Sequence, residues 1–148
     1  MSWNTLLQGN KVHRHRTSIQ EISELRRVVE RDLADAAIHA LSEDRRFATA
    51  YNAALQTAKM AIACAGFRIA SLPGHHHLTF EAAKIAVGKP AERLTDFFDA
   101  CRRKRNEIDY TGAMIATTTE ADELILHAKS FLELVEKWIE VKYPKLKR

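Results

Sequence analysis

The sequence has few of the residues that interrupt helices or cross-link small folds. Its 148 residues include only five glycines, three prolines and two cysteines. So little glycine and proline excludes a collagen-like chain or a linker, and two cysteines are too few for a disulfide framework. No apolar run approaches the roughly 20 residues that a membrane span requires. We therefore expect one cytoplasmic domain with no signal peptide and no membrane association.

The charge balance is only slightly one-sided. Lys and Arg number 23 against 19 Asp and Glu, which leaves a formal charge of +4, and 46% of the residues are hydrophobic. That apolar fraction excludes a disordered chain. A pI near 9.2 favours an anionic partner, although the excess of positive charge is too small to identify one.

The pattern of apolar residues predicts an all-α fold. Apolar residues recur every three or four positions, as in amphipathic helices, and alternating strand patterns are almost absent. We expect an antiparallel up-and-down bundle of four long helices plus one short helix, within residues 17–143. Residues 1–16 are expected to form a flexible basic N-terminal arm, and residues 144–148 a basic C-terminal tail. The long helices are expected near residues 19–40, 43–69, 90–110 and 118–143, and the short one near residues 78–87.

Polar residues mark where these helices begin. Thr17 or Ser18 is expected to cap the first long helix, with Glu21 completing a capping box from Ser18. Thr118 or Thr119 is expected to cap the last one. The second long helix is rich in alanine, which indicates a central helix with neighbours packed closely on several sides.

The most unusual segment, residues 102–110, ends the fourth long helix. Placed at 100° per residue, Arg105 falls on the flank of the apolar stripe of this helix, and Arg102 and Asn106 border the same side. A guanidinium there requires a partner, because a buried unpaired charge is very costly. The partner is either Asp109, one turn further on, or a phosphate from outside the protein.

This segment reads Arg-Arg-Lys-Arg-Asn-x-x-x-Tyr. It resembles the RRxRNxxxY signature of small bacterial stand-alone proteins of the HEPN family (higher eukaryotes and prokaryotes nucleotide-binding). The likeness extends over roughly residues 19–143 through the order of the helices. It implies a four- or five-helix domain that commonly forms a homodimer, in which two signature segments meet across a cleft.

The resemblance also implies an activity. Many HEPN proteins are metal-independent endoribonucleases, often toxins paired with an antitoxin. By resemblance, Arg105 holds the scissile phosphate and Asn106 is the polar residue that follows it. The histidine that catalytic members carry four to six residues after the arginine is absent here. Tyr110 lies near that place but is a poor base, with an unperturbed pKa of about 10.

Family members that lack the full motif act as binding modules, frequently beside a nucleotidyltransferase. In some of those pairs a tyrosine close to the motif accepts nucleotidyl groups. The resemblance therefore gives Tyr110 a second possible role, as such an acceptor.

Three consecutive histidines, His75, His76 and His77, are expected on a Pro-Gly loop before the short helix. Adjacent histidines do not readily ligate one ion, and no other ligand falls at short spacing, so we predict no metal and no cofactor. One of them either orders the loop or reaches Arg105 and supplies the acid–base group that the motif lacks. The sequence does not show at which end of the bundle this loop lies.

Two functions follow. The first is a HEPN-like protein that binds RNA or a nucleotide through Arg102, Arg105, Asn106 and Tyr110, with a toxin-type endoribonuclease as its catalytic form. The alternative is a non-catalytic homodimeric interaction module, such as the partner of a nucleotidyltransferase, whose signature segment is stabilised by an Arg105–Asp109 pair.

Overall fold

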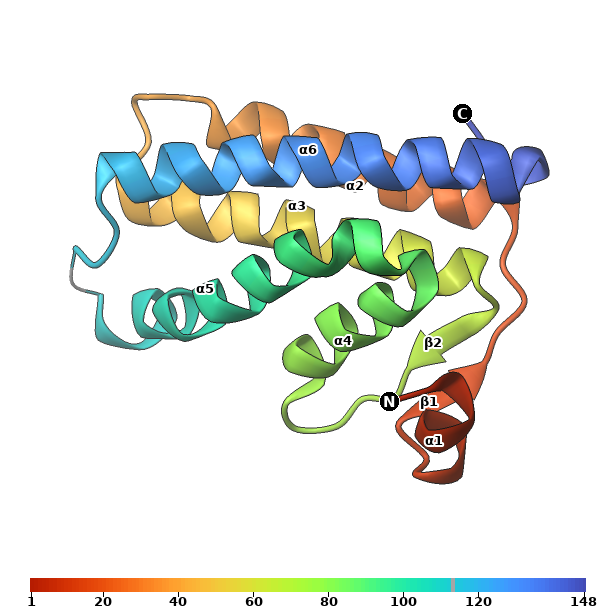
Figure 1. The fold of residues 1–148 in the computed structure, drawn as a ribbon. Helices are drawn as coiled ribbons and strands as arrows, with labels where there is room; N and C mark the ends of the chain where they lie inside the picture. The colour runs from red at the N-terminus through yellow and green to blue at the C-terminus, as the bar shows by residue number, and fades with distance from the viewer. Residues whose placement is uncertain (113) are drawn as a thin grey trace.

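The computed structural model describes residues 1–112 and 114–148, and most of these residues are helical, as predicted (Figure 1). Two short strands, β1 and β2, are also present and pair antiparallel, with Val12 opposite Ile69. The elements are α1 (Trp3–Gln8), β1 (Val12–Arg14), α2 (Ile19–Ala36), α3 (Glu43–Cys64), β2 (Phe67–Ile69), α4 (His75–Val87), the 3-10 turn η1 (Lys89–Ala91), α5 (Glu92–Thr111), α6 (Thr118–Lys142) and the 3-10 turn η2 (Pro144–Leu146).

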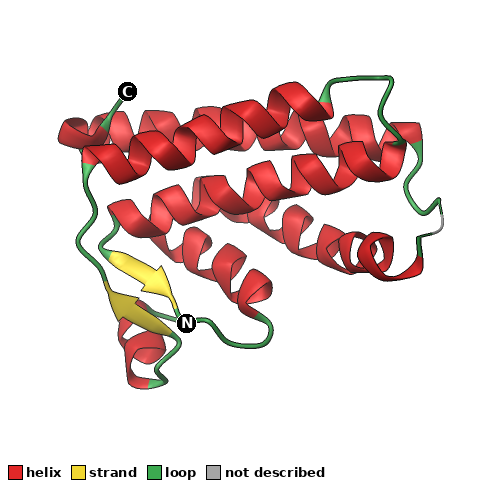
Figure 2. Cartoon of the chain, turned by 180° about the vertical axis from the view of Figure 1, so that it is seen from behind, coloured by secondary structure: helices red, strands yellow, loops and turns green. Residues whose placement is uncertain are grey.

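Helix α3 lies at the centre of the molecule, as its alanine content predicts. Helices α2 and α6 pack along one side of it, and α4 and α5 pack on the other (Figures 1 and 2). Ala50, Ala54, Ala58 and Ala61 of α3 have no solvent exposure. Side chains this small allow neighbouring helices to approach closely on several sides.

The prediction of a flexible N-terminal arm is wrong, because these residues form α1 and β1. Leu6 and Val12 are each only 1% exposed and pack in a second, smaller apolar cluster that also contains Ile62 of α3. Trp3 stacks on Phe67 with ring centroids 4.1 Å apart. The apolar residues of this segment are too few to form a periodic pattern, so only the surface that they cover reveals their role.

The C-terminal tail is also held against the body of the protein. Arg148 pairs with Glu30 of α2 at 2.5 Å. Close by, the buried Arg26 donates two hydrogen bonds to Glu136 of α6, at 2.6 and 2.8 Å. Residues 144–148 are therefore an ordered turn followed by a short paired end, because their charges meet carboxylates on two helices.

Two glycines with positive φ set element boundaries that differ from the prediction. Gly66, with φ of 97°, follows the end of α3 and leads into β2, whereas the apolar pattern predicts helix to residue 69. Gly74, with φ of 77°, precedes α4, so the three histidines occupy the first turn of this helix and not a loop. A left-handed backbone is easily adopted by glycine alone, which explains both boundaries.

The helix caps follow the prediction in part. The Ser18 hydroxyl accepts a hydrogen bond from the Glu21 backbone N–H at 3.1 Å and caps α2. The Glu21 carboxylate does not return to Ser18 but bonds Thr17 and His15, at 2.6 and 2.7 Å. Helix α6 is capped one residue earlier than predicted, by Thr117, which forms a full capping box.

Candidate functional site

Three helices bring polar side chains together beside the signature segment. Tyr51 comes from α3, two histidines come from the first turn of α4, and the remaining residues lie between Asp99 and Asp109 of α5. We call this group the Arg105 cluster, and it comprises Tyr51, His76, His77, Asp99, Arg102, Arg105 and Asp109.

Arg105 is partly buried, as its place on the apolar flank predicts. Its side chain is 28% exposed and pairs with Asp109 one turn further along α5. Its guanidinium carbon lies 5.9 Å from the centroid of the Tyr51 ring, within range of a cation–π contact. Its Nε atom is buried and has no acceptor among the described residues. The internal ion pair therefore leaves one donor of this guanidinium unsatisfied.

His76 also contacts Tyr51. Its Nδ1 atom is 3.3 Å from the Tyr51 hydroxyl. Burial, followed by the nearby charges of His75 and Arg105, lowers the pKa of the His76 imidazole to about 4. Burial likewise raises the pKa of Tyr51 above its usual value, against the opposing effect of Arg105. At neutral pH the pair is therefore an uncharged imidazole and a protonated phenol.

Asp99 connects α4 to the signature segment. Its carboxylate contacts His77 Nδ1 at 2.9 Å and accepts a hydrogen bond from Arg102 Nε at 3.3 Å. His75 does not contact α5 in this way: its Nδ1 atom lies 3.1 Å from the Leu72 carbonyl oxygen, and its ring packs edge-on against the His76 ring with centroids 4.5 Å apart. The histidine segment thus reaches the Arg105 end of the bundle through His76 and His77, but not through His75.

Asn106 and Tyr110 are the two predicted site residues that lie apart from these contacts. The Asn106 side chain makes no hydrogen bond within the part of the chain that the structure describes. Tyr110 is 88% exposed. Its ring points into solvent near the end of α5 and does not approach Arg105 closely enough for any contact among the described residues.

Tyr51 and Asp99 are the cluster residues that the sequence analysis missed. The position of Tyr51 in the apolar stripe of α3 indicates a core residue, and in the structure Tyr51 is only 1% exposed. A buried tyrosine hydroxyl nevertheless requires a partner, and that requirement was the available signal. Asp99 carried no comparable signal beyond Arg102 three residues further on, because its other partner, His77, comes from a different helix.

The cluster is anchored from α3 as well as from α5. The Asp44 carboxylate accepts hydrogen bonds from the backbone N–H groups of Ile115 and Ala116, with shortest distances of 3.0 and 2.7 Å. These two residues belong to the connection that follows α5. The first turn of α3 therefore holds the chain just beyond the signature segment.

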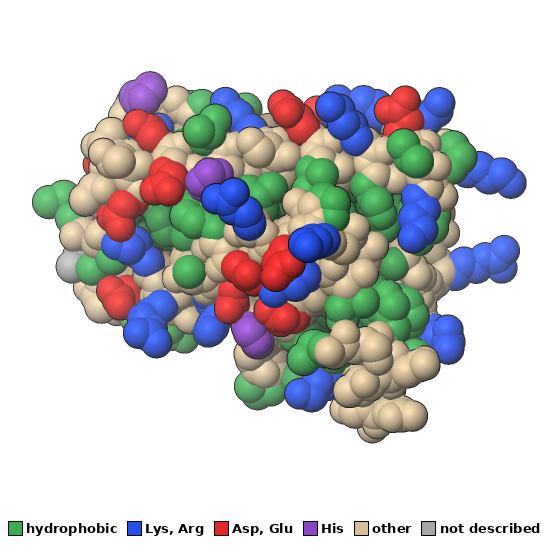
Figure 3. Space-filling view, in the orientation of Figure 1, with side chains coloured by type: hydrophobic (Ala, Val, Ile, Leu, Met, Phe, Trp, Pro, Cys, Tyr) green, Lys and Arg blue, Asp and Glu red, His purple; other side chains and the backbone are tan. Residues whose placement is uncertain are grey.

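Charges of both signs are mixed on the face that Figure 3 shows, over α4 and α5. Lys84, for example, pairs with Asp96 at 2.6 Å and with Glu81 at 3.4 Å. This face is not a broad basic surface of the kind that binds nucleic acid nonspecifically. Recognition of a phosphate there depends on local geometry.

Other chemistries have little support in the described residues. Burial raises the pKa of the Cys64 and Cys101 thiols to about 12 in each case, so neither is a ready nucleophile. No group of three or more potential ligands for a metal ion occurs within residues 1–112 and 114–148. In the same residues, no helix combines the length and apolar character needed to cross a bilayer.

Comparisons with known proteins found no match among family models, curated proteins or solved structures.

Proposed function

We propose that this chain is a HEPN-like protein that binds RNA or a nucleotide and acts as a metal-independent, toxin-type endoribonuclease. One observation carries the proposal: the Tyr51 ring centroid lies 5.9 Å from the Arg105 guanidinium carbon, and the Tyr51 hydroxyl lies 3.3 Å from Nδ1 of an uncharged His76. The signature segment lacks its own histidine, and a histidine from α4 stands in the same cluster. The short motif and the histidine segment, separate in sequence, then form one site.

The guanidinium groups are the phosphate-binding part of this site. Arg105 is partly buried, and its Nε atom has no acceptor among the described residues. Arg102 is held by a single hydrogen bond to Asp99 at 3.3 Å. A phosphate in contact with Arg105 replaces Asp109 as its partner and offers several acceptor oxygens to a fork of donors. Charge that develops on the phosphate during cleavage is stabilised by the same group.

His76 is the proton-transfer group in the proposed reaction. With Nδ1–H donating to the Tyr51 hydroxyl, Nε2 accepts the proton of a ribose 2′-OH. The 2′ oxygen attacks phosphorus, and the bond from phosphorus to the 5′ oxygen breaks. The imidazolium then returns its proton to the leaving 5′ oxygen. The products are a 2′,3′-cyclic phosphate and a 5′-hydroxyl end, and the reaction requires no metal ion.

The partners follow from the same proposal. The chain forms a cytoplasmic homodimer in which two Arg105 clusters face one cleft, and an antitoxin neutralises it. Asn106 lies one residue beyond Arg105, and its amide makes no hydrogen bond among the described residues, so we assign it the orientation of the substrate. Tyr110, exposed at the end of α5, contacts the partner protomer or the RNA.

Cleavage of a mixed RNA pool in the presence of EDTA tests the proposal. Wild-type protein is expected to cleave, and Arg105→Ala to lose about 100-fold or more of the rate. His76→Ala is expected to lose a similar factor through proton transfer. Arg103→Ala is the matched control, because Arg103 belongs to the same basic run but is exposed and makes no contact within the described residues. It should cleave like the wild type.

Arg105→Lys separates a loss of phosphate binding from a loss of folding, because this variant keeps the positive charge and loses only the planar fork of the guanidinium. Circular dichroism establishes that each variant is folded. Cleavage that requires a metal ion contradicts the proposal, as does an Arg105→Ala protein that is folded and fully active.

The interaction-module alternative is favoured by one observation, the Arg105–Asp109 pair within α5. In that case the arginine stabilises its own helix end and the dimer. Arg105→Ala then weakens dimerisation in analytical ultracentrifugation, and fluorescent RNA shows no binding even at low salt, where phosphate contacts are strongest. If the partner is a nucleotidyltransferase, the exposed Tyr110 is its acceptor, and Tyr110→Phe abolishes the mass added to this chain by that enzyme.

A further inference from the structure

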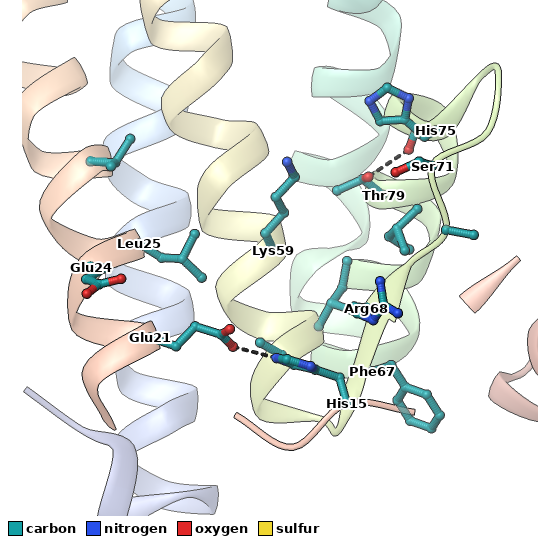
Figure 4. A pocket seen from close by; sticks show the side chains of 15 residues that line it. His15, Glu21, Glu24, Leu25, Lys59, Phe67, Arg68, Ser71, His75 and Thr79 are labelled. Carbon is teal, nitrogen blue, oxygen red and sulfur yellow. Dashed lines mark hydrogen bonds and ion pairs between the residues drawn. The ribbon is translucent and has the colours of Figure 1, made fainter. Parts of the chain in front are cut away.

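A second hollow lies outside the Arg105 cluster, between α2, α3, β2 and the start of α4 (Figure 4). Its volume is about 470 Å³, which falls within the usual range for ligand pockets. None of the cluster residues lines it. His75, whose ring packs against that of His76, is one of its lining residues.

The walls of this hollow are mostly apolar. Leu25 and Val28 of α2 line it, together with Ile62 and Ala63 of α3. Ile69 of β2 lines it as well. Apolar walls of this kind bury the body of a small organic molecule, while a few polar groups fix its orientation.

Lys59 is the main polar group in this space. It is only partly exposed, and its side chain rises from α3 between α2 and the first turn of α4 (Figure 4). No carboxylate of the described residues lies within ion-pair distance of Lys59 or of Arg68, which lines the hollow from β2. A partly buried ammonium beside apolar walls favours an anion that can neutralise it.

The hollow also carries two carboxylates, Glu21 and Glu24, which equal the two cations in number, but neither lies within ion-pair distance of Lys59 or Arg68 among the described residues. Glu21 is already engaged by Thr17 at 2.6 Å and by His15 at 2.7 Å. Burial raises the pKa of Glu21, but these two hydrogen bonds outweigh burial and hold the pKa below its usual value. The other carboxylate, Glu24, is exposed on α2 and accepts a long hydrogen bond from Gln20 at 3.5 Å.

We infer that this hollow binds a small organic anion, with its carboxylate or phosphate head at Lys59 and its apolar body against Leu25, Val28 and Ile62. Arg68 contributes a second positive charge at the edge. The size of the hollow suits a ligand with one or two rings. This site is separate from the proposed ribonuclease site, because it shares no side chain with the Arg105 cluster, although the charge of Lys59 contributes to the lowered pKa of His76.

Isothermal titration of the full chain with three naphthalene compounds tests the inference. The probes are 1-naphthoate, 1-naphthyl phosphate and the uncharged 1-naphthalenemethanol. At least one anion is expected to bind about tenfold or more tightly than the alcohol, because only the anions pair with Lys59. Tighter binding of naphthoate identifies a carboxylate ligand class, and tighter binding of naphthyl phosphate identifies a phosphate monoester class.

Variants locate the binding. Lys59→Gln is expected to weaken the better anion about tenfold, whereas Lys129→Gln, an exposed lysine on α6, leaves it unchanged. Val28→Trp fills the hollow from a partly exposed position on α2 and should block binding, with an unchanged circular dichroism spectrum. The inference is overturned if no probe binds at millimolar concentration, if the alcohol binds as tightly as both anions, or if Lys59→Gln binds like the wild type.

Discussion

At the scale of single residues, the Arg105 cluster depends on a histidine that stays uncharged. His76 is partly buried, bonds the Tyr51 hydroxyl at 3.3 Å, and stands near Arg105 and Arg102. Desolvation and neighbouring cations both disfavour the imidazolium. The same two arginines that suit the cluster to a phosphate thus help to keep His76 uncharged at neutral pH.

The pH dependence of stability checks this state of His76. Its pKa is about 4 in the folded protein, whereas an unperturbed histidine titrates near 6.5, so the unfolded chain takes up the proton first as the pH falls. The free energy of unfolding therefore decreases from pH 6.5 towards pH 4. We expect His76→Gln to remove on the order of 1 kcal/mol of that decrease, after allowance for solvent screening. Urea unfolding at pH 7 and pH 4.5 measures the difference.

His39→Gln is the control, because His39 is exposed between α2 and α3. It should leave the pH dependence unchanged. An NMR titration gives the pKa directly, and a His76 value near 6.5 would contradict the environment described for the cluster.

At the scale of elements, the signature segment is held at its far end by a helix that is distant in sequence. Asp44, in the first turn of α3, accepts backbone hydrogen bonds from Ile115 and Ala116 beyond α5. Nearby, the buried Arg46 pairs with Asp122 of α6 at 2.6 Å and bonds the Ala36 carbonyl of α2 at 2.8 Å. Three helix ends are thereby joined around the start of α3.

Removing the Asp44 carboxylate tests this connection. Asp44→Ala leaves two backbone N–H groups without their charged acceptor, and we expect it to lower the free energy of unfolding by about 1–3 kcal/mol. Urea denaturation measures the loss. Arg45→Ala, at the exposed neighbouring position, is expected to change stability by less than about 0.5 kcal/mol. Equal effects of the two substitutions would show that the contact contributes nothing.

At the scale of the whole molecule, the chain has a main core around α3 and a smaller cluster beneath the N-terminal segment. The smaller cluster joins Leu6 and Val12 to Ile62 of α3 and Leu78 of α4. The pairing of β1 with β2 connects the segment to the chain between α3 and α4. The N-terminal residues are therefore part of the fold that supports the second hollow, since Phe67, Arg68 and Ile69 of β2 line it.

Leu6→Ala tests that role, because Leu6 is only 1% exposed. Loss of its side chain is expected to cost about 2–5 kcal/mol and to open the N-terminal segment before the main core. Hydrogen exchange should accelerate at residues 12–14 and 67–69 while α3 and α6 stay protected. Gln8→Ala, on the exposed face of α1, is the control. Unchanged exchange at β2 in the Leu6→Ala protein would contradict the packing described here.

Much of the helical body was predictable, and the reasons are local. Periodic apolar residues indicated the helices, Ser18 marked the start of α2, and alanine indicated that α3 is central. The ends of the chain were not predictable in this way. Trp3, Leu6 and Val12 form no period, and the charges of residues 144–148 resemble a solvated tail until their partners are known.

The sequence by itself determined the helical class, the order of the helices and the place of Arg105 on the flank of an apolar stripe, with Asp109 one turn away. These properties depend on the spacing of residues along one helix, because the 3.6-residue period fixes which residues share a face of that helix. Only the tertiary structure decided that His76 and Tyr51 lie beside Arg105. It also decided that His75 and Lys59 line a separate hollow, where Lys59 has no carboxylate partner among the described residues. Such juxtapositions depend on how different helices pack, and no period within one segment encodes them.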